Sequence, residues 1–189
     1  MSNEIIKRLP LREKNKVVDF LNEHWGSRHP LVNNEQLFNY YYVDGDMTNF
    51  YYLEDDGEIA AVCGYIKCSE EENSDIWISI WCAKKGKNGL GLSLMGQMQE
   101  LTGAKVMACN NIRQNTMPFY TFLGYHPDEM KHYYRLRKLD EYKMAVVNSK
   151  CIPHCDAPHT ELVEFTDIDA VKQHFSNFEC SSPKKDYWY

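Results

Sequence analysis

The feature that most constrains the fold is a segment rich in glycine and lysine between two apolar runs. Residues 84–92 read Lys-Lys-Gly-Lys-Asn-Gly-Leu-Gly-Leu. They follow the apolar residues 76–81, with only Cys82 and Ala83 between the two segments. This order predicts a strand, a loop and a helix. Glycines let the backbone approach a ligand closely, and the first N–H groups of a helix have no partner within it, so the junction favours a phosphate or pyrophosphate. A solvated turn has the same composition, so a second motif is needed.

That second motif is residues 115–125, Asn-Thr-Met-Pro-Phe-Tyr-Thr-Phe-Leu-Gly-Tyr, which predicts a short helix ended by Gly124. Together the two motifs resemble the GNAT family of acyl-CoA-dependent N-acyltransferases. The family's loop reads Gln/Arg-x-x-Gly-x-Gly/Ala, and Gly89 and Gly91 match its two small residues. Gly86 stands in place of the Gln or Arg, which removes one phosphate contact but none of the backbone donors.

The resemblance extends over most of residues 4–137. The family's second motif is matched by Asn115, Phe119, Tyr120, Leu123, Gly124 and Tyr125. The fold implied is α/β (mixed α+β), a central mixed and mostly antiparallel sheet flanked by helices, with a C-terminal appendage. The strand, helix, strand unit around the glycine loop (residues 84–92) is expected to be a right-handed crossover.

Local patterns predict the ends of several elements. Asn34 is a good N-cap for a helix, and residues 55–57, Asp-Asp-Gly, predict a hairpin turn. The helix after the glycine loop is expected to start near Leu90, and strands are expected at 104–109 and 131–137.

The resemblance also implies a binding site for acetyl-CoA, or another acyl-CoA, as co-substrate. The backbone of residues 81–83 would pair with pantetheine, residues 86–91 would hold the pyrophosphate, and Asn115 would bond the pantetheine amides. The cofactor-binding residues expected are Trp81, Cys82, Ala83, Gly86, Lys87, Asn88, Gly89, Leu90, Gly91 and Asn115. The three lysines of residues 84–87 could supply the charge of the missing Gln or Arg.

Tyr120 is the expected catalytic acid. The resemblance places its hydroxyl near the thioester sulfur, where it can donate a proton to the departing thiolate. An isolated tyrosine flanked by phenylalanines would more often be a core aromatic, and the motif reverses that preference. His24, His29 and Ser79 are candidates for a general base, but none matches a family motif, so the base stays unassigned.

Three function classes remain open from the sequence. The leading one is an acyl-CoA-dependent N-acyltransferase that acts on a small-molecule amine. Residues 40–42, Trp77 and Trp81 could pack on a sugar ring, and residues 77–81 resemble GNAT-like proteins of bacterial surface-carbohydrate pathways, which favours an amino sugar. The alternatives are a GNAT-like module that binds CoA or a sugar nucleotide without turnover, and an unrelated phosphate-ligand binder. The acyl chain, the acceptor and the oligomeric state stay open.

Composition limits the partners. A net charge of -6 and a pI near 5.6 argue against nucleic acid. The 7 cysteines, an odd number without an apolar N-terminal segment, predict free thiols and a cytoplasmic location. No apolar run approaches the roughly 20 residues that span a bilayer, so no membrane partner is expected.

The sequence divides into three regions. Residues 1–140 form the expected acyltransferase domain, 141–160 a linker, and 161–189 an appendage or the start of a truncated second domain. The last region predicts a strand at 161–165 followed by a helix, a unit that needs the first domain or a partner to cover its apolar face. The linker holds Cys151, His154, Cys155 and His159. Their Cys-x3-Cys-x3-His spacing matches no common zinc site, so no metal is expected.

Overall fold

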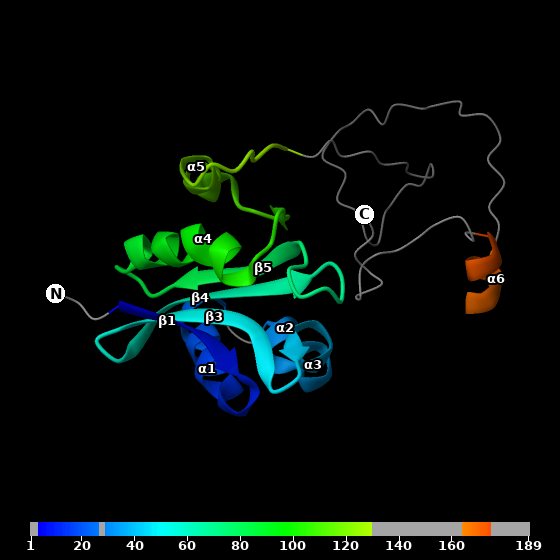
Figure 1. The fold of residues 1–189 in the computed structure, drawn as a ribbon, viewed down its shortest axis with the longest axis horizontal. Helices are drawn as coiled ribbons and strands as arrows, with labels where there is room; N and C mark the ends of the chain where they lie inside the picture. The colour runs from blue at the N-terminus through cyan, green and yellow to red at the C-terminus, as the bar shows by residue number, and fades with distance from the viewer. Residues whose placement is uncertain (1–3, 27–28, 130–163, 175–189) are drawn as a thin grey trace, which may run out of the picture. The chain divides into compact units, whose positions relative to one another are not determined.

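A six-stranded sheet organises the chain in the computed structural model, which describes residues 4–26, 29–129 and 164–174 (Figure 1). The strand order is β1-β3-β4-β5-β6, and β2 pairs with β3. The strands are β1 (Glu4–Pro10), β2 (Val43–Asp44), β3 (Met47–Asp55), β4 (Glu58–Lys67), β5 (Ile76–Ala83) and β6 (Met107–Cys109). All pairs are antiparallel except β5 with β6. The expected mixed, mostly antiparallel sheet is therefore confirmed.

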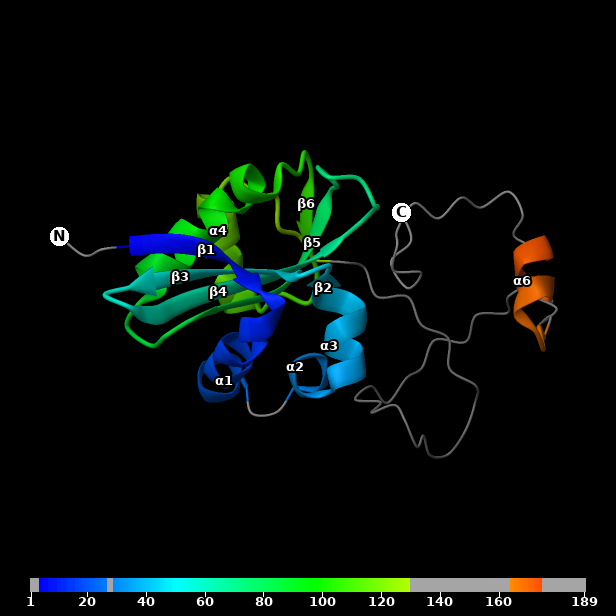
Figure 2. The same ribbon diagram turned by 60° about the horizontal axis from the view of Figure 1, so that its bottom comes forward.

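Helices cover both faces of this sheet. They are α1 (Lys14–His24), α2 (Pro30–Asn33), α3 (Glu35–Tyr42), α4 (Asn88–Thr102) and α5 (Met117–Phe122), with the 3-10 helices η1 (Leu11–Glu13) and η2 (Gln114–Thr116). Figures 1 and 2 show α1, α2 and α3 on one face and α4 on the other. In the described ranges, every helix is too short or too polar to cross a membrane. The helix α6 (Ile168–His174) lies in a second unit, where the Asp167 side chain accepts from the Ala170 amide.

Two apolar clusters fill the space between the sheet and its helices. One contains Leu21 of α1 and Phe38 of α3, and the other contains Leu94 and Met98 of α4. All four side chains are almost fully buried. The helices α1, α3 and α4 each bury one apolar stripe, as the periodicity of the sequence predicts. The sheet thus separates an α1–α3 core from an α4 core.

Local signals fixed several element ends correctly. Asn34 caps α3, since its side chain accepts from the Leu37 amide at 3.0 Å. The β3–β4 turn has positive φ at Asp56 (52°) and Gly57 (85°), as a type I′ hairpin turn requires.

Other boundaries differ from the sequence prediction. α4 begins at Asn88 rather than Leu90, because the Lys87 carbonyl already accepts from the Leu90 amide. β6 spans only three residues instead of the expected 104–109. Glu164 and Phe165 lie in no strand, while residues 161–163, the expected strand 131–137 and the Cys/His group of 151–159 lie outside the described residues.

β5 contains a bulge at Ser79. Gly64 pairs with Ile80 and the next residue of β4 pairs with Ile78, so Ser79 is an extra residue. Beyond the bulge, the odd and even positions of β5 exchange faces of the sheet. Ile78 joins the α4 core, whereas Ile80, two positions later, joins the α1–α3 core.

Hydrogen bonds from α3 hold this bulge. The Tyr42 hydroxyl lies 3.0 Å from the Ser79 hydroxyl, which donates to the Gly64 carbonyl at 3.0 Å. Tyr42 is completely buried. The bulge is therefore held by a side chain of α3, which packs on one face of the sheet.

Replacing Tyr42 with Phe should lower the free energy of unfolding by about 1 kcal/mol, because a buried hydrogen bond is lost without a change of shape. Urea unfolding measures the change. Tyr40→Phe, at a tyrosine that is 45% exposed, is the control and should stay within about 0.5 kcal/mol of the parent. Equal effects of the two variants would show that the Tyr42 hydrogen bond does not stabilise the bulge.

Candidate functional site

The parallel strands β5 and β6 part after a short contact. They pair only at Ile76↔Met107, Trp77↔Ala108 and Ile78↔Cys109. β6 ends there, while β5 runs on to Ala83. Along residues 81–83, β5 pairs with β4 on one side, and no described strand pairs with the other side. Trp81, Cys82 and Ala83 therefore lie on an open sheet edge where an extended ligand can add like a strand.

The glycine loop that follows β5 presents unpaired backbone donors. Its turn is closed by the Lys87 amide, which donates to the Lys84 carbonyl at 2.9 Å, and Gly86 has φ +83°. The amides of Lys85, Gly86, Asn88 and Gly89 donate to no acceptor in the part of the chain that the structure describes. Unpaired amides at the start of a helix favour an anion.

Two of the loop lysines are paired with acids of the β3–β4 hairpin. The Lys87 ammonium lies 2.6 Å from the Asp55 carboxylate, and the Lys84 ammonium lies 2.9 Å from that of Glu58. Lys85 forms no ion pair within the described ranges. The expectation that all three lysines supply charge to a phosphate is therefore too simple, because two of them already have carboxylate partners.

Gly91 and Trp81 join the glycine loop to the second motif. The Trp81 indole N–H donates to the Gly91 carbonyl at 3.0 Å, and its ring lies 5.4 Å from the Tyr120 ring, edge to face. A Cβ added to Gly91 would lie only 2.8 Å from the Ala83 Cβ, so α4 packs closely on β5. The family resemblance implies only a backbone role for Trp81, whereas its side chain also links the two motifs.

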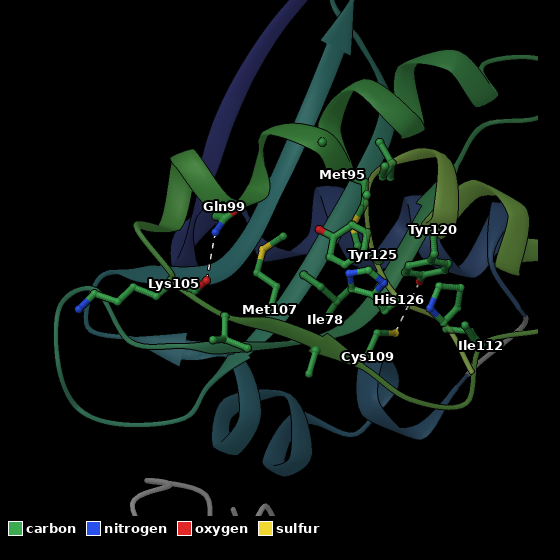
Figure 3. A pocket seen from close by; sticks show the side chains of 16 residues that line it. Ile78, Met95, Gln99, Lys105, Met107, Cys109, Ile112, Tyr120, Tyr125 and His126 are labelled. Carbon is green, nitrogen blue, oxygen red and sulfur yellow. Dashed lines mark hydrogen bonds between the residues drawn. The ribbon is translucent and has the colours of Figure 1, made fainter. Parts of the chain in front are cut away.

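Tyr120 lies at the end of the β5–β6 contact. Its ring packs against Tyr125 at 5.8 Å, and its hydroxyl lies 3.5 Å from the Cys109 sulfur (Figure 3). Only 6% of the residue is exposed. Burial strongly raises the pKa of Tyr120, so the hydroxyl holds its proton at neutral pH. The hydroxyl can therefore donate a hydrogen bond.

A cavity of about 520 Å³ opens beside this hydroxyl, between α4, β6 and the segment after α5 (Figure 3). Its lining includes Met95, Gln99, Met107, Cys109, Tyr120 and His126. Asn115 does not line it and lies exposed in η2. The structure therefore brings Tyr120 to the cavity and leaves Asn115 outside it.

The base candidates from the sequence lie elsewhere. His29 caps α2, since its Nδ1 accepts from the Leu31 amide at 3.3 Å, and Ser79 belongs to the bulge network. Neither of them, nor His24, lines the cavity. His126 does line it. The only sequence signal for His126 is its position directly after the Leu-Gly-Tyr motif.

The aromatic set proposed for a sugar ring is divided by the sheet. Tyr41, Tyr42 and Trp77 belong to the α1–α3 core, and Trp81 packs in the α4 core. These residues therefore do not form one continuous surface.

The described cysteines, Cys63, Cys68, Cys82 and Cys109, are free thiols, as expected. Burial raises the pKa of the Cys82 thiol to about 11, so it is protonated at neutral pH. Cys82 therefore offers a ligand its backbone rather than a thiolate.

No protein-family model matches this sequence, and no curated protein sequence does either. Solved structures do match. An aminoglycoside N-acetyltransferase, AAC(6')-Iy in complex with CoA, is 14% identical with a TM-score of 0.53, over 73% of this chain and 97% of the other. AAC(6')-Ih from Acinetobacter baumannii is 12% identical with a TM-score of 0.51, over 72% and 99%. The chain thus has the GNAT fold, as the two motifs implied.

Proposed function

We propose that this chain is an acyl-CoA-dependent N-acyltransferase that transfers an acetyl group from acetyl-CoA to a small-molecule amine. One observation carries the proposal. The open edge of β5 leads from unpaired amides at the start of α4 to the Tyr120 hydroxyl where β6 ends. A ligand with a diphosphate at one end and a thioester at the other suits this sequence of groups.

In the proposed reaction the amine nitrogen attacks the thioester carbonyl carbon. The carbon–sulfur bond breaks, and its electron pair stays on the sulfur. Tyr120 donates its proton to that sulfur, which gives the thiol of CoA and a tyrosinate. Solvent takes the proton that the amine loses and returns one to Tyr120. Burial raises the pKa of Tyr120, so the hydroxyl is protonated before each turnover, and the same burial disfavours a lasting tyrosinate, which solvent reprotonates.

Amino sugars and aminoglycosides are the acceptors we propose to test first. Two proteins of the same fold are aminoglycoside N-acetyltransferases. A role in bacterial surface-carbohydrate synthesis remains a prediction from residues 77–81.

Two measurements test this function. Acetyl-CoA should raise the melting temperature, and addition of an amine panel should cause loss of the thioester absorbance. Stabilisation by acetyl-CoA without thioester loss on any amine would favour the non-catalytic CoA-binding module. Absence of any binding to CoA thioesters would refute both the acyltransferase and the non-catalytic CoA-binding module.

Replacing Asp55 with Asn should tighten acetyl-CoA binding about twofold to fivefold, the range of a partly exposed ion pair. The change removes a negative charge beside the loop and frees Lys87. Asp55 also lines a hollow of about 340 Å³ with Gly86, Lys87, Gly89 and Leu90. Calorimetry at low and high salt should show the gain shrinking with salt.

Glu35→Gln is the matched control, because it removes the ion pair between Glu35 of α3 and Lys14 of α1, away from the loop. It should leave acetyl-CoA affinity unchanged. Weaker binding by Asp55→Asn would mean that the ion pair holds the loop in its binding conformation.

A further inference from the structure

The Tyr120 ring has a fixed position. It packs edge to face on Trp81 and on Tyr125, and the Tyr120 carbonyl accepts from the Tyr125 amide at 3.0 Å. With the ring held in this way, the remaining freedom is the rotation of the hydroxyl hydrogen about its C–O bond. Whatever accepts that hydrogen sets the direction in which the proton points.

Cys109 is the group in position to accept it. It is the last residue of β6 and lies opposite Ile78 at the final β5–β6 pair. Its sulfur lies 3.5 Å from the Tyr120 oxygen, and its S–H donates to the Asn110 carbonyl at 3.6 Å. A thiol has a single proton. While that proton is directed to Asn110, the bond with Tyr120 must be donated by the tyrosine to the sulfur.

We propose that Cys109 is a positioning residue for the acyl transfer, because its sulfur accepts the Tyr120 proton in a hydrogen bond at the point where β5 and β6 separate. The inference rests on the proposed function. Both residues line the same cavity, so a thioester sulfur that reaches Tyr120 also comes close to Cys109.

The weakness of the acceptor suits this role. Sulfur accepts hydrogen bonds weakly, whereas a carboxylate or amide oxygen would hold the proton more tightly. The proton is therefore oriented in the resting protein and is still readily passed to a departing thiolate, which is the stronger acceptor.

Four single variants and one double variant test the proposal. Cys109→Ala should lower kcat about threefold to tenfold, the range of one neutral hydrogen bond, and leave acetyl-CoA affinity unchanged. Cys109→Ser keeps an acceptor and should stay within about threefold of the parent. Cys63→Ala, which truncates another buried thiol of the α4 core, is the control for packing and should retain the parent kcat.

The decisive readout is the double-mutant cycle with Tyr120→Phe. Cys109→Ala should change kcat by less than about twofold in the Tyr120→Phe background, because its effect passes through the missing hydroxyl. Equal losses in both backgrounds, or a parent-like kcat of Cys109→Ala alone, would overturn the role of Cys109. Parent-like turnover of Tyr120→Phe would instead overturn the proposed acid, and with it the basis of this inference.

Discussion

Tyr120→Phe is expected to lower kcat for acyl transfer about 100-fold, at the lower end of what a positioned general acid contributes. The variant removes only the hydroxyl, and the ring contacts with Trp81 and Tyr125 can remain. The departing thiolate would then take its proton from water. The measurement is steady-state loss of the thioester with the best amine of the panel.

Binding serves as the control for this variant. The affinity for acetyl-CoA should stay within about twofold of the parent, because the expected contacts with the diphosphate and pantetheine lie on the loop and on β5. A 100-fold loss of kcat that is matched by an equal loss of affinity would point to a binding role for Tyr120. An unchanged kcat would exclude Tyr120 as the acid.

Gly91→Ala is expected to destabilise the protein by about 1–3 kcal/mol, the usual cost of overpacking a close contact. Its Cβ would lie 2.8 Å from the Ala83 Cβ, and both atoms are fixed by the backbone. The start of α4 must then move away from β5, which displaces the amides of the loop. Acetyl-CoA affinity should fall about tenfold, equivalent to about 1.4 kcal/mol.

Gly89→Ala is the matched control for stability. A Cβ at this position would meet nothing within 4 Å, and alanine is favoured over glycine in a helix. This variant should raise the free energy of unfolding by about 0.5–1 kcal/mol in the same denaturation experiment. If both alanines stabilise the protein, close packing of α4 on β5 does not limit the loop geometry.

The elements that the sequence predicted well are set by neighbouring residues. The Asp56–Gly57 turn and the Asn34 cap depend on contacts within a few positions, so residue type is sufficient to recognise them. The strand, loop and helix at 76–102 were recognised in the same way. The two motifs added the order of the remaining elements.

The contacts that sequence reasoning missed join distant residues. Tyr120 meets Cys109 across 11 positions, and Lys87 meets Asp55 across 32. Hydrophobic periodicity reports which face a residue occupies, but it does not identify the partner on the next element. His126 was missed for the same reason, since nothing local indicates that the chain after α5 passes the cavity.

The bulge at Ser79 was hidden for a different reason. Every residue of β5 except Ser79 is apolar, and both faces of the sheet are covered by apolar cores. A side chain of β5 that changes face therefore moves from one buried apolar core to the other. The pattern of hydrophobic and polar residues does not change at the reversal, and only the strand register reveals it.

The single extra residue in β5 has a consequence for protein engineering. In residues 76–78 the even positions face the α4 core, whereas in residues 80–83 the odd positions do, so a graft from another protein of this fold must be aligned separately on each side of Ser79. A transplant that treats the strand as one regular ladder would exchange the two faces in one half of β5, and would place side chains meant for the α4 core in the α1–α3 core.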